Sequence, residues 1–379
     1  MSGPLEGLTI VEMAGMGPAP LAGQLLADLG AEVTVIERAA GGERPHDVNN
    51  RNKRSIALNL KAEGGAALAL EIIGHADVLM EGFRPGVMER LGLGPETCLA
   101  RNPGLVYARM TGWGQDGPMA QMAGHDLNYV AQTGMLHMMG HADRPPLPPL
   151  NLVADYGGGT MFLIFGILSA LWEKARSGKG QVVDVAMIDG VVSLGSVFAA
   201  LTAQSLWTQE RESNLLDGGS PYYQVYATAD GGFVSIAAIE PQFFAELAEK
   251  AGIPADLAAR RDDRTTWPQQ RAEYAAIFAR RTRDEWARIF DGSDACLVPV
   301  LTPDEAITHP HNAARQAHVE VAGLMQAAPA PRFSRSQPDA PRPPVPAGAD
   351  THDILAACGF DAAARDDLVA RGVIAPAAR

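Results

Sequence analysis

The sequence predicts an α/β protein, with a large domain on a parallel, doubly wound sheet and a smaller α+β domain after it. In the first half of the chain, buried-strand patterns alternate with helical patterns, as they do in parallel sheets. After about residue 220, apolar and polar residues alternate with a period of two, which is typical of antiparallel strands. The length of 379 residues also favours about two domains.

The first half opens with a strand–helix–strand pattern. Residues 8–12 form an apolar run typical of a buried strand, and residues 21–29 repeat apolar side chains at helical spacing. Gly30 ends this helix before a second strand at residues 32–37. The remaining predicted elements are strands at 76–80 and 105–109 and long helices at 160–174 and 185–208.

The second half contains a hairpin signal. Residues 222–228 and 232–238 alternate in polarity around Ala229-Asp230-Gly231, a sequence that favours a tight turn. Helices are expected at residues 241–251 and 283–291, which gives a small α+β domain over 225–320. The proline-rich residues 326–348 predict a linker or an extended crossing segment, followed by a short helix near 351–358.

Composition narrows the classes of partner and compartment. The formal net charge of −13 argues against nucleic acid as the main partner, because phosphate backbones select basic surfaces. The three cysteines lie far apart in sequence, without metal-ligand spacing, which favours a reduced, cytoplasmic setting. No signal peptide is visible, and the most apolar run, residues 160–172, is too short to span a bilayer. We therefore expect a soluble protein that does not bind a membrane.

The turn after the first strand has an incomplete dinucleotide fingerprint. Gly15 and Gly17 follow the strand and Glu37 comes about 20 residues later, as in NAD-binding folds. However, Pro20 replaces the third glycine, and Pro18 lacks the N–H that would meet a pyrophosphate. A tight structural turn is the better interpretation, and a nicotinamide dehydrogenase is disfavoured.

Basic residues gather near the predicted carboxyl ends of the strands, where ligands bind in open α/β sheets. Individually, such residues are typical of solvated loops. Together they favour a phosphate-rich ligand on an otherwise acidic chain. They are Arg38, Lys53, Arg54, Lys61, Arg84 and Arg90.

His125 and Asp155 are two separate candidate proton carriers, each surrounded by small or apolar residues. Two bases on opposite faces of one carbon can remove a proton from one side and return it to the other, which is racemase chemistry. Structural roles are open for both: His125 can be a packing histidine, and Asp155 can cap a helix that begins near Gly158.

Several longer stretches resemble the class III CoA-transferase superfamily, and the resemblance extends over essentially the whole chain. They are Gly82-Phe83-Arg84-Pro85-Gly86, Arg109-Met110-Thr111-Gly112-Trp113-Gly114-Gln115, Ser177-Gly178-Lys179-Gly180-Gln181-Val182-Val183-Asp184, Cys296-Leu297-Val298-Pro299-Val300 and Pro331-Arg332-Phe333-Ser334. Within that superfamily, Gly124-His125-Asp126-Leu127-Asn128-Tyr129 and Ala238-Ile239-Glu240-Pro241-Gln242-Phe243-Phe244 resemble the α-methylacyl-CoA racemase branch.

The resemblance implies a Rossmann-like large domain that binds CoA rather than NAD, in an interlocked homodimer. Each active site would lie between the large domain of one subunit and the small domain of the other. The implied organisation is a large CoA-binding domain over 1–190, a linker helix region over 191–224, a small α+β domain over 225–320, and a crossing segment over 321–379 that returns to the large domain.

The resemblance also assigns roles to residues of the predicted site. His125 and Asp155 act as the two bases, and Glu240 from the partner subunit orients His125 or shares its proton. The backbone N–H of Asp126 stabilises the enolate oxygen, and Gly157-Gly158-Gly159 allows the backbone to approach the thioester arm. No metal, flavin or nicotinamide is needed, because CoA is part of the substrate. The residues expected to hold it are Arg38, Ala57, Leu60, Lys61, Arg84, Arg90 and Tyr129.

Two other functions compete with racemisation. A CoA-transferase of the same superfamily would use Asp155 as a nucleophile, but an aromatic residue usually stands there in place of His125. A non-catalytic CoA-ester binding protein would need the arginines and glycines without His125, Asp155 and Glu240 together. The acyl group stays open among branched fatty acyl, steroid side-chain and arylpropionyl thioesters, although the methionines at 135–139 and Met161 suit a flexible apolar chain.

Overall fold

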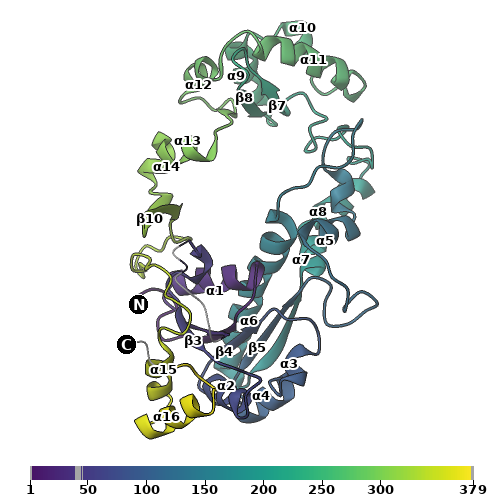
Figure 1. Cartoon of the computed structure of the whole chain (residues 1–379). Helices are drawn as coiled ribbons and strands as arrows, with labels where there is room; N and C mark the ends of the chain where they lie inside the picture. Colours follow the sequence, from purple (N-terminus) through teal and green to yellow (C-terminus); the bar gives the residue numbers. More distant parts are fainter. Residues whose placement is uncertain (1, 39–43, 45, 377–379) are drawn as a thin grey trace. The chain divides into compact units, whose positions relative to one another are not determined.

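A computed structural model describes residues 2–38, 44 and 46–376, and its contacts divide the chain into two compact units (Figure 1). We call them the large unit (Met1–Val130, Leu150–Leu194 and Ala313–Arg379) and the small unit (Ala131–Pro149 and Gly195–Asn312). The domain boundaries inferred from the sequence stay a prediction.

The large unit is built on a parallel six-stranded sheet, which confirms the predicted α/β class. The strand order is β3-β2-β1-β4-β5-β6, and every neighbouring pair is parallel. The order reverses between β1 and β4, which is the point where doubly wound sheets open a crevice for ligands. The strands are β1 (Thr9–Met13), β2 (Glu32–Glu37), β3 (Arg54–Ala57), β4 (Val78–Glu81), β5 (Val106–Thr111) and β6 (Gln181–Ala186).

The four strands predicted in the first half are confirmed within two residues, because each is an apolar run that the sheet buries on both faces. The single long helix predicted at 185–208 is wrong. Residues up to Ala186 belong to β6, and the rest forms two helices, α7 (Met187–Leu194) and α8 (Ser196–Ala203), separated at Gly195. An apolar edge strand running into an apolar helix has no change of composition to mark the boundary.

Helices cover both faces of this sheet (Figure 1). On one face, α1 (Pro18–Asp28) packs on β1 and β2, and α6 (Phe162–Ser177) packs on β5 and β6. The other face carries one apolar core shared by the sheet and five helices. These helices are α2 (Gly65–Gly74), α3 (Val87–Arg90), α4 (Pro95–Arg101), α15 (Thr351–Ala357) and α16 (Ala362–Ala370). The predicted helix near 351–358 is confirmed, whereas α16 was not predicted.

A ten-residue π-helix, Leu152–Met161, runs directly into α6. Among the described residues, the combined stretch Leu152–Ser177 is long and apolar enough to cross a membrane by length and composition alone. The sequence-based estimate of a span limited to 160–172 is therefore wrong in length, because the π-helix extends it at its amino end. One side of the stretch packs on β5, β6, α1 and α7 within the large unit, whereas other apolar side chains, such as Phe165 and Trp172, are exposed.

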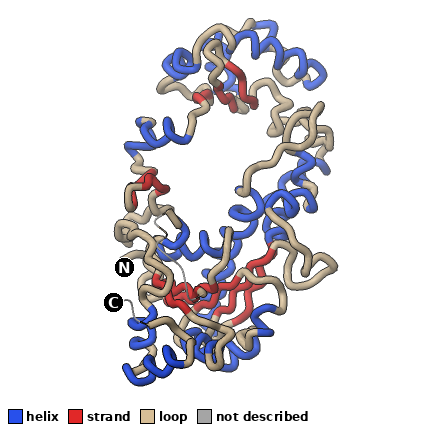
Figure 2. Tube along the Cα trace, in the orientation of Figure 1, coloured by secondary structure: helices blue, strands red, loops and turns tan. Residues whose placement is uncertain are grey.

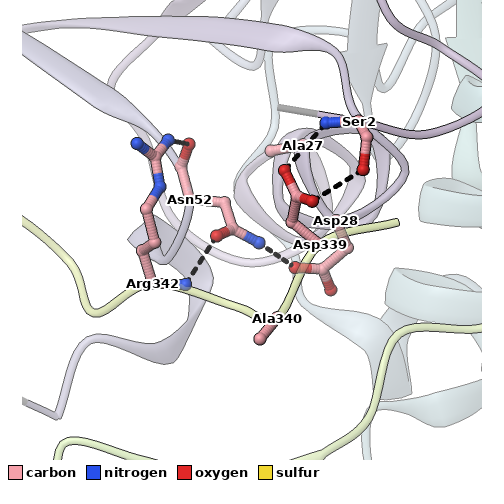
Figure 3. Close-up of a pocket in the computed structure, with 7 residues that line it drawn as sticks. All are labelled: Ser2, Ala27, Asp28, Asn52, Asp339, Ala340 and Arg342. Atoms are coloured by element: carbon pink, nitrogen blue, oxygen red, sulfur yellow. Dashed lines mark hydrogen bonds between the residues drawn. The ribbon is translucent and has the colours of Figure 1, made fainter. Parts of the chain in front are cut away.

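The C-terminal chain is fastened to the large unit by a buried polar cluster (Figure 3). Asn52 exchanges backbone and side-chain hydrogen bonds with Arg342: the Asn52 N–H donates to the Arg342 carbonyl, and the Arg342 N–H donates to Asn52 Oδ1 at 2.7 Å. Asn52 also donates to Asp28 at 2.7 Å. Nearby, Ser2 donates to Asp339 through its N–H and its hydroxyl. The small pocket in Figure 3 is lined by groups that already bind one another, so we assign it a structural role.

The small unit contains the predicted hairpin, whose strands appear in red in Figure 2. β7 (Tyr223–Ala227) and β8 (Phe233–Ala237) are antiparallel, and β9 (Leu297–Pro299) adds to β8. An aromatic-rich core joins these strands to the flanking helices. The helices predicted at 241–251 and 283–291 are confirmed as α9 (Pro241–Ala251) and α12 (Arg283–Phe290).

Candidate active site

His125 lies immediately before α5 (Asp126–Gln132), at the exposed start of this short helix. Its carbonyl accepts hydrogen bonds from the N–H groups of Asn128 and Tyr129, and its own N–H donates to Asn128 Oδ1 at 3.1 Å. The backbone on both sides of the imidazole is thereby fixed. The ring itself stays open to solvent, as a base that meets a substrate must be.

The Tyr129 side chain, one helical turn after His125, packs tightly against Trp113 and two glycines. Its hydroxyl donates to the Gly124 carbonyl at 2.5 Å, and its ring meets Trp113 edge-on at a centroid distance of 4.7 Å. A Cβ on Gly112 would lie only 2.1 Å from this ring, and a Cβ on Gly124 would meet it at 2.8 Å. Both positions therefore require glycine, which explains two glycines of the stretches that carry the family resemblance.

The Asp126 carboxylate joins the start of α5 to the π-helix. Its Oδ2 accepts the N–H groups of Ala154 at 2.7 Å and of Asp155 at 2.9 Å, and the residue is only 4% exposed. The other oxygen, Oδ1, is buried without a hydrogen-bond partner in the described part of the chain. Asp126 thus sets the distance between the backbones of the two predicted bases.

Asp155 is a half-buried carboxylate inside the π-helix, so the alternative role as the N-cap of a helix near Gly158 is wrong. Burial raises its pKa, and the charge of Asp126 raises it further, while Asn151 and the charge of His125 oppose the shift. A Cβ on Gly17 would lie 3.9 Å from Asp155 Oδ2, which places the carboxylate beside the turn before α1. π-Helical turns of this kind are frequent at functional sites.

The glycines that follow Asp155 serve helix packing. A Cβ on Gly158 would meet the Met187 carbonyl at 2.7 Å, and a Cβ on Gly190 of α7 would meet the Gly158 carbonyl at 2.0 Å. Gly159 faces Pro18, whose carbonyl accepts from the Thr160 hydroxyl at 2.8 Å. The prediction that Gly158 and Gly159 admit the thioester arm is therefore wrong, because the π-helix uses these positions to approach α7 and α1 closely.

Arg84 and Arg90 follow β4 at the carboxyl edge of the sheet, and both side chains are exposed. The positive charge of Arg84 lowers the pKa of Tyr129, against the larger effects of burial and of Asp155, which raise it. Arg84 therefore lies within electrostatic reach of the Tyr129 hydroxyl. The Arg90 guanidinium lies 3.1 Å from the position of a Cβ on Gly86, in the loop between the two arginines.

The other predicted CoA-binding residues follow β2 and β3 at the same edge. Arg38 directly follows β2 and is exposed, and Lys61 is exposed as well, with Leu60 partly buried between Lys61 and the sheet end. Ala57 is buried, and its N–H donates to the Thr351 hydroxyl at 3.1 Å. Parallel strands bring these loops to one edge, but their role in binding CoA stays a prediction.

Two other basic residues do not take part in a phosphate site. Lys53 is buried and donates to Glu12 Oε2 at 2.7 Å and to the Pro20 carbonyl at 2.9 Å. A Cβ on Gly23 would overlap the Glu12 carboxylate, so α1 closes over the pair. Arg54 pairs with Glu32 at 2.8 Å near the opposite, amino end of the strands. The sequence-based inclusion of Lys53 and Arg54 is wrong, because Lys53 is buried in its pair with Glu12 and Arg54 lies at the amino end of β3, paired with Glu32.

Glu240 belongs to the small unit, whereas His125, Asp126 and Asp155 belong to the large unit. It is exposed and stands at the N-cap position of α9, with no capping hydrogen bond from its side chain. The partnership of Glu240 with His125 stays a prediction.

The large unit therefore brings together an imidazole and a carboxylate of raised pKa, at the carboxyl edge of the sheet. An imidazole and a carboxylate with a raised pKa are typical of sites for general acid–base chemistry. Among the described residues, no group of three or more histidine, cysteine, aspartate or glutamate side chains is placed to hold a metal ion.

Sequence reasoning missed three features of the candidate site. It assigned Asp126 only a backbone N–H, whereas its carboxylate organises the site by accepting from residues 154 and 155. It also missed the π-helix, for which the triple glycine at 157–159 was the available signal. The tight packing around the Tyr129 ring could have been suspected only from Gly112 and Gly124, to which the sequence assigned no role.

Comparison with known proteins identifies the family. The model of "CoA-transferase family III" matches residues 5–351. The chain is 44% identical to an alpha-methylacyl-CoA racemase from Mus musculus over 94% of this chain and 93% of that protein. It is also 44% identical to the human protein of the same name over 82% and 81% of the two chains. A solved structure of a CAIB/BAIF family protein from Brucella suis matches with a TM-score of 0.81 and 27% identity, over 94% of this chain and all of that one (100%). The chain belongs to CoA-transferase family III.

Proposed function

We propose that the protein is a racemase that interconverts the (R) and (S) epimers of 2-methylacyl-CoA thioesters by two-base transfer of the α-proton. The observation that carries this proposal is the pairing of His125 with Asp155 through the Asp126 carboxylate, which supplies two proton carriers in one site. The two relatives at 44% identity, both named alpha-methylacyl-CoA racemase, support the same reaction.

In the proposed reaction, one base takes the α-proton and the C–H electron pair moves into the thioester, which becomes an enolate. The other group, already protonated, then delivers a proton to the opposite face of the same carbon. Asp155 is the base for one epimer and His125 is the base for the other. After one turnover, the group that began as the base is protonated and the group that began protonated has lost its proton. A second turnover in the reverse direction restores both.

We further propose the supporting roles. The N–H of Asp126 stabilises the enolate oxygen, because the first N–H groups of a helix have no acceptor within the helix. Glu240, supplied by the small unit of a second copy of the chain, orients His125. CoA is held by the exposed cations Arg38, Lys61, Arg84 and Arg90, with Ala57, Leu60 and Tyr129 beside the nucleotide and pantetheine. No further cofactor is required.

An apolar stripe that runs from the end of the π-helix along α6 supports a homodimer. Met161, Phe165, Leu168 and Trp172 recur at helical spacing and are 54%, 70%, 39% and 71% exposed. Contiguous exposed apolar side chains of this size mark association surfaces. We propose that a second copy covers the stripe, and that the protein works in the cytoplasm, where its three free cysteines stay reduced. Sedimentation as a monomer at micromolar concentration would contradict the dimer.

A single incubation tests the proposed reaction. One epimer of a 2-methylacyl-CoA is incubated with the protein in heavy water, and the α-carbon is followed by stereochemistry and by deuterium content. We expect both epimers to appear, with deuterium at the α-carbon and without any acceptor. His125→Ala should abolish the conversion.

The same incubation exposes the main alternative, a CoA-transferase with Asp155 as nucleophile. A free carboxylate is added in a parallel sample. Absence of α-exchange, together with formation of the CoA ester of the added acid, would replace racemisation by transfer.

A further inference from the structure

The segment that carries Glu240 is a strand-to-helix turn fixed through its backbone. The N–H of Ala237 donates to the Cys296 carbonyl at 2.9 Å, and the N–H of Ala238 donates to the Tyr222 carbonyl at 3.0 Å. The Ile239 carbonyl accepts from Arg261 Nη2 at 2.6 Å. The turn is thus tied to its surroundings immediately before Glu240 by a charge-assisted hydrogen bond, which is stronger than a neutral one.

Glu240 is not placed there as a helix cap. Two other helices of the small unit, α12 and α13 (Pro303–Thr308), begin with Thr282 and Thr302, which form complete capping boxes. α9 begins instead with Glu240, whose side chain makes no capping bond and is exposed. Glutamate is a poor N-cap compared with Ser, Thr, Asp or Asn. The carboxylate is therefore free for a partner outside the turn.

Arg261 is itself held rigidly. Its guanidinium carbon lies 4.1 Å from the centroid of the Tyr222 ring and 4.3 Å from that of Phe244, so the group is clamped between two aromatic faces. Phe244 is on the first turn of α9, where its N–H donates to the Glu240 carbonyl at 3.0 Å. One cation therefore touches both the residue before Glu240 and the helix after it.

The other two nitrogen atoms of the Arg261 guanidinium make weaker contacts than Nη2, which donates to the Ile239 carbonyl. Nε donates to Asp262, whose side chain is 77% exposed, and such surface pairs contribute little. Nη1 is buried and has no acceptor within the part of the chain that the structure describes. The strongest contact of this side chain is thus the one that sets the Glu240 turn.

We propose that Arg261 is a positioning residue for Glu240, which fixes the Ile239–Glu240 backbone so that the carboxylate can partner the imidazole base. The inference rests on the proposed racemase function. It assigns Arg261 no contact with substrate, so its loss should lower kcat with little change in KM for the acyl-CoA.

The test compares Arg261→Met with a matched control, Arg264→Met. Arg264 belongs to the same unit, donates to the Leu206 carbonyl at 2.9 Å and lies 5.2 Å from the Trp267 ring centroid, but it does not touch the Glu240 turn. Racemisation of one 2-methylacyl-CoA epimer is measured for both variants. We expect Arg261→Met to lower kcat by about tenfold or more, less than the roughly 10²–10⁴-fold contribution of an acid–base group itself, and Arg264→Met to leave it unchanged.

A double-mutant cycle with Glu240→Gln separates positioning from a general loss of folding. If Arg261 acts through Glu240, Arg261→Met should cause almost no further loss of kcat in the Glu240→Gln background. An equal loss in both backgrounds, or an equal loss for Arg264→Met, overturns the inference. Arg261→Lys, which keeps the cation but not the planar stack, should recover part of kcat and replaces the methionine variant in the cycle if that variant does not fold.

The two proposals fail in different ways. A wild-type protein that does not racemise overturns the proposed function and this inference with it. A wild-type protein that racemises, with additive losses in the cycle, overturns only the role of Arg261.

Discussion

Two aspartates of the large unit have opposite surroundings. Asp28, in α1, is completely buried, and its carboxylate accepts from Arg51 at 2.6 and 3.0 Å and from Asn52 at 2.7 Å. Asp155, in the π-helix, is half-buried, and its nearest charged carboxylate neighbour, Asp126, repels it. Asp28 is paired with an arginine, whereas Asp155 has a raised pKa.

The difference shows how one residue type serves structure in one place and chemistry in another. A buried carboxylate with a bidentate arginine partner joins two segments, here α1 and the segment that pairs with the C-terminal chain. A carboxylate that is partly desolvated without such a partner, as Asp155 is, has a raised pKa. Three substitutions test this difference between Asp28 and Asp155.

The largest effect is expected for Asp155→Asn. The amide is nearly isosteric but cannot accept the α-proton, so racemisation should fall by roughly 10²–10⁴-fold. The thermal midpoint should change little, because Asp155 makes no salt bridge in the described part of the chain. The two readouts are the rate of epimer conversion and the melting curve of the same sample. Near-full activity would disprove the role of Asp155 as a base.

A stability effect is expected for Arg51→Met, which leaves Asp28 buried without its partner. Breaking one side of a buried ion pair destabilises by about 3–5 kcal/mol. Arg101→Met is the matched control, because Arg101 pairs with Glu71 on the surface and such pairs contribute about 0–1 kcal/mol. Urea denaturation at one fixed protein concentration measures both. Equal shifts of the two midpoints would show that burial does not distinguish these pairs.

The smallest effect is a pH shift for Asp126→Asn. The charge of Asp126 raises the pKa of Asp155, so removing that charge should lower it. Asp155 acts as a base only when ionised, and the acidic limb of the kcat/KM profile should therefore move to lower pH. The asparagine oxygen can still accept from Ala154 and Asp155, so the site should keep its geometry. A limb that stays in place or moves to higher pH would show that Asp126 does not tune Asp155.

Folding stability depends on the ionisation of Asp155 in the direction opposite to activity. Because the pKa of Asp155 is raised in the folded state, its contribution to stability is present below the pKa of the unfolded chain. That contribution is lost as the pH rises through the raised, folded-state pKa. Asp126→Asn should reduce this loss, which a comparison of melting midpoints on either side of that pH range would detect.

Much of the fold followed from local patterns. The strands β1, β2, β4 and β5 are apolar runs between turn residues, and the β7–β8 hairpin has the Asp230-Gly231 turn that its pairing requires. The failures lie where local patterns are ambiguous. β6 is an edge strand that continues into α7, and β3, the other edge strand, begins with Arg54-Ser55 and lacks the continuous apolar run that marks β4, so periodicity detected neither.

The site was predicted in part. His125 and Asp155 stand out by residue type, and the structure links them through Asp126. The sequence did not show that Lys53 and Arg54 differ in role from Arg84 and Arg90, because all four are cations near predicted strands. Only the tertiary structure shows that Lys53 is buried against Glu12, while Arg84 is exposed within electrostatic reach of Tyr129.

The sequence by itself determined the class of fold and the family and singled out His125 and Asp155 as candidates, because strand periodicity, glycine positions and residue types are local properties of the chain. Only the tertiary structure decided what surrounds each charge. Whether a carboxylate is a fastener like Asp28 or a proton acceptor like Asp155 depends on desolvation and on neighbours far away in sequence. Those neighbours become known only when the strands and helices are packed.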